Sequence, residues 1–399
     1  MAATEPLPLA GLTVVAVEQA VSAPFATRQL ADLGARVIKV ERPDGGDFAR
    51  AYDTAARGLA SHFVWANRGK ESLALDLKDP RGLEVLHALL EGADVFVQNL
   101  AQGAAARLGL DAAALCARYP RLVAVDISGY GEGGPYAHKR AYDMLVQCEA
   151  GLVSVTGTPE RPVKAGIPAA DIAAAMYAFS GVLAALLRRG TTGRGGPVEI
   201  SMLESLAEWM GHPLHHTMHG GEQPVRTGLA HAVIAPYDAY ATADGDRVLL
   251  SVQNDREWRR LAREVLERPE LAEDPSYATN AARTRGREST DAVVAGVLGK
   301  LSADEAVERL EAAGIACARL NSVAQLAGHP QLAARDRWRE VDSPAGPLRA
   351  LLPPIGLPGG AEARMGAVPA LGEHTDALLR ALGMTDARIA ELRGNGVVA

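Results

Sequence analysis

LTVVAVEQAVSAPFATRQLADLGARVIKV, residues 12–40, carries the pattern on which the prediction of the fold rests. Two short runs rich in β-branched residues, LTVVAV (12–17) and ARVIKV (35–40), enclose a helix-length segment from Phe25 to Leu33. A strand, a helix and a second apolar strand in this order are typical of a parallel sheet that is covered on both faces.

The same alternation continues through the first third of the chain. Further apolar runs stand at SLALDL (72–77), DVFVQN (94–99) and LVAVDIS (122–128), with helical patterns at Pro80–Glu91 and Ala112–Arg118 between them. We therefore expect an α/β fold with a Rossmann-like open parallel sheet.

The later sequence predicts a second, smaller domain. A strand is expected at Val198–Ser201 and another at Arg247–Gln253, and amphipathic helices at Arg256–Leu266 and Ala303–Ala313. Residues 211–231 are rich in Gly and His and resemble a linker or a long loop. We predict a large domain over 1–210, a linker over 211–230, a small α/β domain over 231–325 and a C-terminal return to the large domain over 326–399.

Composition narrows the functional class. The 399-residue chain is 48% hydrophobic and 22% charged, as expected for a soluble globular protein, and its net charge of −7 argues against nucleic acid as a partner. No signal peptide is visible in residues 1–9, and no membrane span is expected. Cys116, Cys148 and Cys317 form no CxxC pair, which suits a cytoplasmic protein without a zinc framework.

One carboxylate is isolated from other charges. Asp171 heads DIAAAMYAFSGVLAALLRR (171–189), which predicts a mostly buried helix with Asp171 as its N-cap and Gly190 just beyond its end. As a cap, Asp171 would contribute about 1 kcal/mol to stability. Alternatively, the helix N-terminus keeps the carboxylate ionised where water is scarce, and such a carboxylate is a nucleophile.

Two further motifs have an ordinary structural interpretation. Gly129, Gly131 and Gly134 match GxGxxG spacing, but Pro135 follows them and the first βα turn lacks glycine, so they predict a tight loop beside a pocket. Four histidines (His212, His215, His216 and His219) have helical spacing without an HExxH acid. They predict a polar hinge or pocket wall, and no metal site is expected.

Basic residues follow the ends of the predicted strands. They are Lys39, Arg42, Lys78, Arg107, Lys139 and Arg140. Because ligands of open parallel sheets bind at the carboxyl ends of the strands, these cations indicate either a site for a nucleotide with several phosphates or a set of ordinary surface charges.

Several stretches together resemble a known family. They are SAPFATRQLADLGARVIKVERPDGGDFAR, NRGKESLALDLKDP, ISGYGEGGPY, YDMLVQCEAGLVSVTG, AGIPAADIAAA, TTGRGGPVEIS and GEHTDALLRALG. In this order, over about residues 9–398, the chain is similar to the class III CoA-transferases, the formyl-CoA and carnitine CoA-transferase family. It departs from the family's usual AGPF with SAPF (22–25), and only Gly220 and Gly221 stand where some members carry a glycine-rich loop.

The resemblance implies a mechanism and a site. Asp171 would attack an acyl-CoA and become an aspartyl-CoA thioester, which then transfers CoA to a carboxylic acid. Coenzyme A is a substrate here, and no permanently bound cofactor is implied. The resemblance also implies an interlocked homodimer. The residues expected along coenzyme A are Val21, Ser22, Arg42, Leu75, Lys78, Asn99, Leu100, Ala101, Arg107, Lys139, Arg140, Tyr142 and Asp143.

Details of the chemistry follow from the same hypothesis. Tyr142, Asp143 and Gln147 would shape the acyl pocket. A carboxylate with a reference pKa of about 4 is ionised at neutral pH, so Asp171 would need no general base. Backbone N–H groups at the head of the Asp171 helix would stabilise the tetrahedral oxyanions.

Alternatives remain open at this level. An α-methylacyl-CoA racemase is similar in fold and has an aspartate at the matching position. Where this chain has Tyr142-Asp143, however, the racemases have a His-Asp pair, and the histidine base is absent here. A non-catalytic CoA-binding protein is a third hypothesis. Among transferases, the variants favour short dicarboxylates such as succinate, itaconate, mesaconate or malate. Arg50, Arg226 and His231 are candidates for holding the distal carboxylate.

Overall fold

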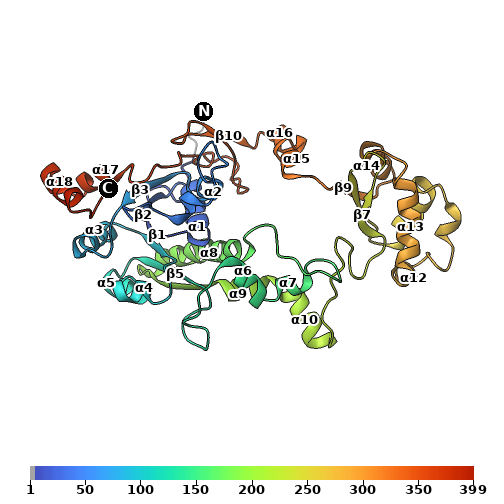
Figure 1. The fold of residues 1–399 in the computed structure, drawn as a ribbon, viewed down its shortest axis with the longest axis horizontal. Helices are drawn as coiled ribbons and strands as arrows, with labels where there is room; N and C mark the ends of the chain where they lie inside the picture. Colours follow the sequence, from blue (N-terminus) through green and yellow to red (C-terminus); the bar gives the residue numbers. More distant parts are fainter. Residues whose placement is uncertain (1–4) are drawn as a thin grey trace. The chain divides into compact units, whose positions relative to one another are not determined.

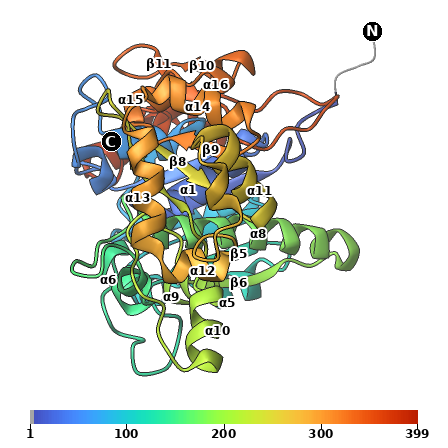
Figure 2. The same cartoon turned by 90° about the vertical axis from the view of Figure 1, so that its right-hand side faces the viewer.

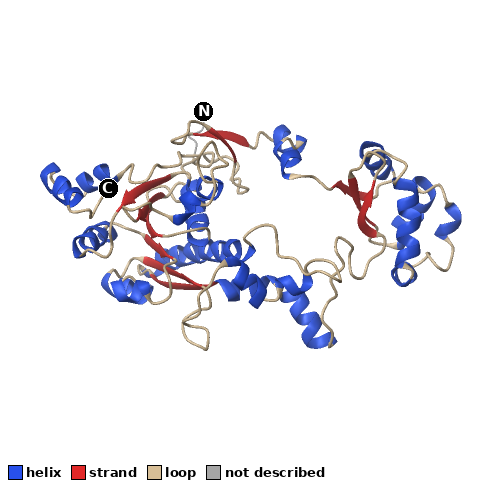
Figure 3. Cartoon of the chain, viewed as in Figure 1, coloured by secondary structure: helices blue, strands red, loops and turns tan. Residues whose placement is uncertain are grey.

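The computed structural model describes residues 5–399, and their contacts divide the chain into two compact units. The large unit comprises the residues up to Leu152 together with Ala165–His212 and Arg335–Ala399. The small unit comprises Val153–Lys164 and Pro213–Ala334. Figure 1 labels their elements along the chain, and Figure 3 separates helices from strands.

The large unit is built on a six-stranded sheet in which all neighbouring strands are parallel. The strand order is β3-β2-β1-β4-β5-β6, with β1 Thr13–Val17, β2 Arg36–Glu41, β3 Lys70–Ala74, β4 Val95–Gln98, β5 Val123–Ser128 and β6 Gly196–Ser201. Because β2 and β4 lie on opposite sides of β1, the direction of winding reverses at β1. The prediction of a Rossmann-like open parallel sheet is confirmed.

Helices cover both faces of this sheet. Val14 and Ala16 of β1 belong to one apolar core and Val15 and Val17 to another, because successive strand residues point to opposite faces. The first core contains α1 (Ser22–Asp32) and α8 (Ala169–Thr192), both labelled in Figure 2. The second contains α3 (Pro80–Glu91), α5 (Ala112–Arg118), α17 (Thr375–Ala381) and α18 (Asp386–Gly394).

The C-terminal segment closes the β3 edge of the large unit. Asp76 N–H donates to Val397 O at 2.8 Å, and Gly69 N–H donates to Ala367 O at 2.7 Å. Two short antiparallel strands, β10 (Trp338–Val341) and β11 (Leu348–Leu351), precede this segment. Backbone groups from residues some 300 positions apart therefore share one edge.

The remaining elements of the large unit are shorter. They are the 3₁₀ turn η1 (Phe48–Ala51), α2 (Ser61–Asn67), α4 (Ala104–Leu108), α6 (Asp143–Glu149) and α9 (Met202–Trp209). Two helices, α7 (Leu152–Val155) and α10 (Gly211–Gly220), cross from one unit to the other along the chain.

The small unit has its own sheet and core. Its antiparallel strands are β7 (Tyr237–Ala241), β8 (Arg247–Ser251) and β9 (Ala316–Arg319). Its helical elements are α11 (Asp255–Arg260), the π-helical η2 (Leu261–Val265), the 3₁₀ turn η3 (Pro269–Ala272), α12 (Asn280–Arg285), α13 (Arg287–Leu298), α14 (Ala303–Ala312), α15 (Val323–Ala327) and α16 (Pro330–Ala334). Trp258 is fully buried at the centre of its core.

The helix that carries Asp171 is longer than predicted at both ends. Pro168 is the N-cap of α8, so Asp171 lies in the first turn and the prediction of Asp171 as N-cap was wrong. The helix also continues past Gly190 to Gly193, whose φ of 73° is the left-handed conformation that ends helices. By length and composition α8 is the one candidate membrane span in residues 5–399, a test that core helices also pass.

The borders of the units differ from the predicted ones. The small unit begins at Pro213 and ends at Ala334, and it includes Val153–Lys164. Arg226 binds this distant segment by donating to the carbonyl oxygens of Ser154, Thr158 and Pro159. The predicted linker is also partly helical in α10, because Pro213 lies in the first turn, where its missing N–H has no helical partner to lose.

Candidate functional site

Two cavities lie where the strands of the large sheet end. The Asp171 cavity, of about 840 Å³, lies between the residues after β1, β4 and β5 and the start of α8. The Arg42 cavity, of about 380 Å³, lies at the ends of β1, β2 and β3. Both are lined by Gln19 and Leu100, so the two cavities share a wall.

Most of the predicted site residues line these cavities. Those in the Asp171 cavity are Val21, Ser22, Asn99, Leu100, Ala101, Lys139, Arg140, Tyr142, Asp143 and Asp171. Those in the Arg42 cavity are Arg42, Leu75, Lys78 and Leu100. The single sheet edge thus collects residues from six separate parts of the sequence, as expected where the carboxyl ends of parallel strands meet.

Two predicted cations lie elsewhere. Arg107 lies in the last turn of α4 and lines neither cavity. Lys39 is fully buried, and its Nζ binds Asp47 Oδ2 at 2.8 Å and the Glu18 carbonyl oxygen at 3.2 Å. The side chain of Lys39 is therefore closed to a phosphate ligand, because its donors already have partners.

Asp171 has an altered acidity. Burial and the nearby Asp143 carboxylate together raise the pKa of Asp171 to about 7, while Ser22 acts in the opposite direction. The expectation of full ionisation at neutral pH was wrong, because burial disfavours the charged form. Near pH 7 Asp171 therefore exists in both its protonated and its ionised form.

Asp143, at the start of α6, caps the helix that carries Asp171. Its Oδ1 accepts hydrogen bonds from Ala170 N–H at 2.8 Å and Asp171 N–H at 3.3 Å. Its Oδ2 accepts from Gln147 Nε2 at 2.7 Å, and Gln147 Oε1 accepts from Ala165 N–H. The backbone donors expected to stabilise oxyanions at the head of α8 are therefore occupied by Asp143.

The loop between β1 and α1 faces Asp171. Asn99 holds this loop, because its Oδ1 accepts from Gln19 N–H at 2.9 Å and its Nδ2 donates to Gln19 O at 2.8 Å and to Ser22 Oγ at 3.2 Å. Ala20 has a positive φ of 62°, and its N–H donates to Asp47 Oδ1 at 3.0 Å. Gln19 and Ser22 are thus held by Asn99, and Ala20 is held by Asp47.

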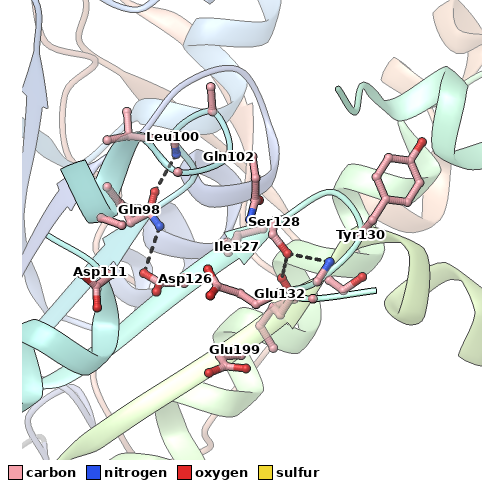
Figure 4. Close-up of a pocket in the computed structure, with 18 of the residues that line it drawn as sticks. Gln98, Leu100, Gln102, Asp111, Asp126, Ile127, Ser128, Tyr130, Glu132 and Glu199 are labelled. Atoms are coloured by element: carbon pink, nitrogen blue, oxygen red, sulfur yellow. Dashed lines mark hydrogen bonds between the residues drawn. The ribbon is translucent and has the colours of Figure 1, made fainter. Parts of the chain in front are cut away.

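The glycine-rich loop after β5 borders a third, acidic cavity. Figure 4 shows Asp111, Asp126, Glu132 and Glu199 around this space of about 330 Å³. Gln98 donates to Asp126 and accepts from Leu100 N–H at 2.7 Å, which turns the chain after β4. The predicted tight loop beside a pocket is confirmed. The carboxylates make this cavity repulsive to phosphate.

The residues proposed to hold a distal carboxylate lie outside the Asp171 cavity. Arg50 forms an ion pair with Glu41 at 2.7 Å, and Arg226 binds backbone carbonyls of the small unit. His231 stacks on Tyr237 in the same unit. The basic side chains that do line the Asp171 cavity are those of His62, His138, Lys139 and Arg140.

Sequence patterns missed one wall of the Asp171 cavity. Phe48, Tyr52 and His62 line it from η1 and α2, a region without regular strand or helix periodicity. Tyr52 and His62 meet edge to face at 5.5 Å between ring centroids. Burial raises the pKa of Tyr52 to about 12, and the negative charges of Asp47 and Asp171 act in the same direction.

The four histidines lie on or beside α10. His215 and His219 stack with ring centroids 5.5 Å apart, and His216 Nδ1 is 3.1 Å from Glu222 O. Within residues 5–399, no group of three or more His, Cys, Asp or Glu side chains is placed to hold a metal ion. The three cysteines are free thiols.

Comparison with known proteins places the chain in a family. A family model described as CoA-transferase family III matches residues 9–375. The chain is 34% identical to a succinate–glutarate CoA-transferase of Agrobacterium fabrum, over 82% of this chain and 84% of the relative. It is also 34% identical to an acetyl-CoA:oxalate CoA-transferase of Acetobacter aceti, over 82% and 85%.

A solved structure agrees with these sequence matches. The CAIB/BAIF family protein of Brucella suis is 31% identical and superposes with a TM-score of 0.85, over 95% of this chain and all of the other. The family model and the solved structure both match nearly the whole chain, and this match includes the parallel sheet that carries the two cavities. The chain belongs to CoA-transferase family III.

Proposed function

We propose that this enzyme transfers CoA from an acyl-CoA to a dicarboxylic acid, and that Asp171 carries the CoA as a thioester between the two. The observation on which the proposal rests is the position of the Asp171 carboxylate. It is partly buried in a cavity of about 840 Å³ that adjoins a second cavity with exposed cations.

The Arg42 cavity has the properties of a nucleotide site. Its walls are largely apolar, with Val17, Val40 and Leu75 beneath, which suits the adenine base. Arg42 and Lys78 are exposed at its border and would pair with the phosphates. The wall that it shares with the Asp171 cavity gives the pantetheine arm a route to Asp171.

The transfer needs no net proton movement. The ionised Asp171 carboxylate attacks the thioester carbonyl and the C–S bond breaks. CoA thiolate is released, and Asp171 and the acyl group form a mixed anhydride. The thiolate then attacks the Asp171 carbonyl carbon, and the donor acid leaves as a carboxylate. The acceptor carboxylate attacks the aspartyl thioester and the two steps run in reverse, which regenerates the Asp171 carboxylate.

Dicarboxylates are the substrates favoured by charge and by the relatives. Of the basic side chains lining the Asp171 cavity, Arg140 is exposed, and His62 Nδ1 lies 3.7 Å from Asp53 Oδ2. The exposed guanidinium of Arg140 suits the second carboxylate of a diacid. The relatives named for succinate with glutarate, and for oxalate, also use diacids. We propose succinyl-CoA as donor, with glutarate, malate, itaconate or mesaconate as acceptor.

Mass spectrometry can test the intermediate directly. The enzyme is incubated with succinyl-CoA without an acceptor, and the peptide containing Asp171 is examined for a CoA adduct. We expect the adduct in the native enzyme and neither adduct nor turnover in Asp171→Ala. Turnover by Asp171→Ala, or an adduct on another residue, would overturn the proposal.

An acceptor panel then defines the substrate and separates the alternative activities. Glutarate, L-malate, itaconate, mesaconate and oxalate are compared with acetate at equal concentration. We expect the diacids to exceed acetate at least tenfold in kcat/KM, or about 1.4 kcal/mol. Exchange of the α-proton of a 2-methylacyl-CoA without CoA transfer would indicate a racemase. Binding of acyl-CoA without either reaction would indicate a non-catalytic protein.

A further inference from the structure

Asp47 is a buried carboxylate that the proposed mechanism has not used. It is 2% exposed, it lines the Arg42 cavity, and its side chain binds the backbone of a loop that lines the Asp171 cavity. Its Oδ2 forms an ion pair with Lys39 Nζ at 2.8 Å, and its N–H donates to Glu41 Oε2 at 3.1 Å. Lys39 and Glu41 both belong to β2. Asp47 is therefore anchored to β2 through its side chain and its backbone.

The other oxygen of Asp47 joins two walls of the Asp171 cavity. Its Oδ1 accepts from Ala20 N–H at 3.0 Å and from Ala49 N–H at 2.9 Å. Ala20 belongs to the loop between β1 and α1, which forms one wall. Ala49 belongs to η1, and Phe48 and Tyr52 at the ends of η1 line the cavity from another side. A single oxygen atom therefore sets the spacing between these two walls.

The backbone of Ala20 has a conformation that needs support. Its φ of 62° lies in the left-handed region, which residues with a β-carbon rarely adopt unless the surrounding structure holds them there. Gln19, the residue before it, is held by Asn99 through two hydrogen bonds of 2.9 and 2.8 Å. Asn99 follows β4 and Asp47 follows β2, so the loop after β1 is held from both of the neighbouring strands.

We propose that Asp47 is a positioning residue that keeps the β1–α1 loop and η1 close enough together to exclude water from Asp171 during the reaction. The inference rests on the proposed function of Asp171. The mixed anhydride and the aspartyl thioester are both activated acyl groups. Water that reached either carbonyl would give its hydroxyl to the carbon and its proton to the leaving carboxylate or thiolate. The spacing of the cavity walls therefore decides between transfer and hydrolysis.

Asp47→Asn tests this role with a side chain of the same size. The Ala20 N–H, the Ala49 N–H and the Lys39 ammonium are all donors, so either orientation of the new amide places its NH₂ group against one of them. With succinyl-CoA and the most active diacid of the acceptor panel, we expect kcat for transfer to fall by about tenfold or more, because the cavity walls shift.

The ratio of succinyl-CoA hydrolysis to CoA transfer is the decisive measurement. In Asp47→Asn this ratio should rise at least about fivefold, because water reaches the activated acyl groups. A variant that is only less stable has a smaller folded fraction, which lowers both rates equally. The ratio is therefore unaffected by a loss of stability alone, and it separates a positioning role from a purely structural one.

Asp94→Asn is a matched control at the opposite edge of the sheet. Asp94 also joins a backbone N–H to a cation, because Oδ2 accepts from Thr13 N–H at 2.9 Å and Oδ1 accepts from Arg189 Nη2 at 2.9 Å. It precedes β4, at the amino ends of the strands, and lines neither cavity. Asp94→Asn should unfold more easily in urea, while its hydrolysis ratio stays within about twofold of the native value.

A second variant breaks the same link from the side of the loop. Ala20→Pro removes the N–H that Asp47 binds and fixes φ at about −65°, while the ion pair of Lys39 with Asp47 stays in place. We expect the hydrolysis ratio to rise in Ala20→Pro as in Asp47→Asn.

The outcomes separate this inference from the proposed function. A native hydrolysis ratio in Ala20→Pro and Asp47→Asn, in an enzyme that still forms the CoA adduct on Asp171, would overturn the role of Asp47 alone. An equal rise of the ratio in Asp94→Asn would also overturn it, because any loosening of the sheet would then produce the effect. A native enzyme that neither transfers CoA nor forms the adduct would overturn the proposed function, and this inference with it.

Discussion

The surroundings of Asp171 act on its pKa in two opposite directions. Burial and the Asp143 carboxylate raise its pKa to about 7, while the donors of Ser22 favour its charged form. The proposed nucleophile is therefore only partly ionised at neutral pH, in a cavity where it is poorly hydrated. A carboxylate of this kind is more basic than one in water and attacks a thioester more readily.

Removal of the Asp143 charge should extend activity to lower pH. In Asp143→Asn the amide oxygen still accepts from the head of α8, while the repulsion that raises the pKa of Asp171 is lost. We expect the acid limb of kcat/KM to move to lower pH. Loss of the hydrogen bond from Gln147 Nε2 to the second Asp143 oxygen costs about 1 kcal/mol of stability. An unchanged acid limb would contradict the assignment of that limb to Asp171.

Asp171 also lowers stability at neutral to basic pH. Its pKa is raised from 3.8 to about 7 on folding, so the folded state binds a proton that the unfolded state releases, and stability falls as pH rises through this window. At pH 8, Asp171→Asn should be more stable by about 2–4 kcal/mol. Urea unfolding at pH 8 and pH 4 measures this. Equal gains at both pH values would contradict it.

The existence of helix α8 could be predicted from the sequence, but the residues at which it begins and ends could not. Its run of Ala, Leu and Met residues indicates a buried helix, and Ala170, Ala174 and Ala178 do pack on the sheet. The ends could not be predicted, because the N-terminus is capped by Asp143 from α6 and not by a neighbouring residue. Capping rules apply to local side chains, and here the cap comes from 27 positions away.

The turn between β1 and α1 depends on a buried ionic cluster. Glu18, Lys39 and Lys70 have side chains with no exposed surface, and Lys39 Nζ binds Asp47 Oδ2 at 2.8 Å. Asp47 Oδ1 in turn binds Ala20 N–H, within the loop that leads to Ser22. The cluster therefore fixes the backbone of the loop that lines the Asp171 cavity.

Loss of one charge in this cluster should strongly destabilise the protein. Lys39→Met leaves Asp47 and Glu18 buried with too little positive charge, and we expect unfolding to become easier by about 3–5 kcal/mol. Arg36→Met on the same strand breaks an exposed pair with Glu71 and should cost at most about 1 kcal/mol. Comparable losses in the two variants, measured by urea denaturation, would contradict a structural role of the cluster.

At the scale of the whole molecule, large apolar side chains remain at the surface of the single chain. Leu187, Met218, Val225 and Val323 are 76%, 65%, 71% and 83% exposed. Side chains of this kind are unfavourable in contact with water, and their number suits coverage by a second chain. The resemblance to class III CoA-transferases led to the same expectation of a homodimer.

The homodimer is testable without any assumption about activity. Size-exclusion chromatography with light scattering should give twice the chain mass of 41.8 kDa at micromolar concentration. Val323→Glu, which places a charge on the most exposed of these side chains, should shift the equilibrium toward monomer if Val323 lies in the interface. A native protein that elutes and scatters as a monomer would contradict the prediction.

The sequence by itself determined the parallel sheet and the buried helix of Asp171, and it singled out that carboxylate as a candidate for catalysis. These follow from apolar periodicity and from an isolated charge, both of which are local properties. Only the tertiary structure decided which donors reach Asp171. Asp143 and Asp171 are 28 positions apart, and Asn99 and Ser22 are 77 apart. Contacts over such distances depend on how the elements pack, so neither the pKa of Asp171 nor its hydrogen-bond partners could be predicted from the order of residues.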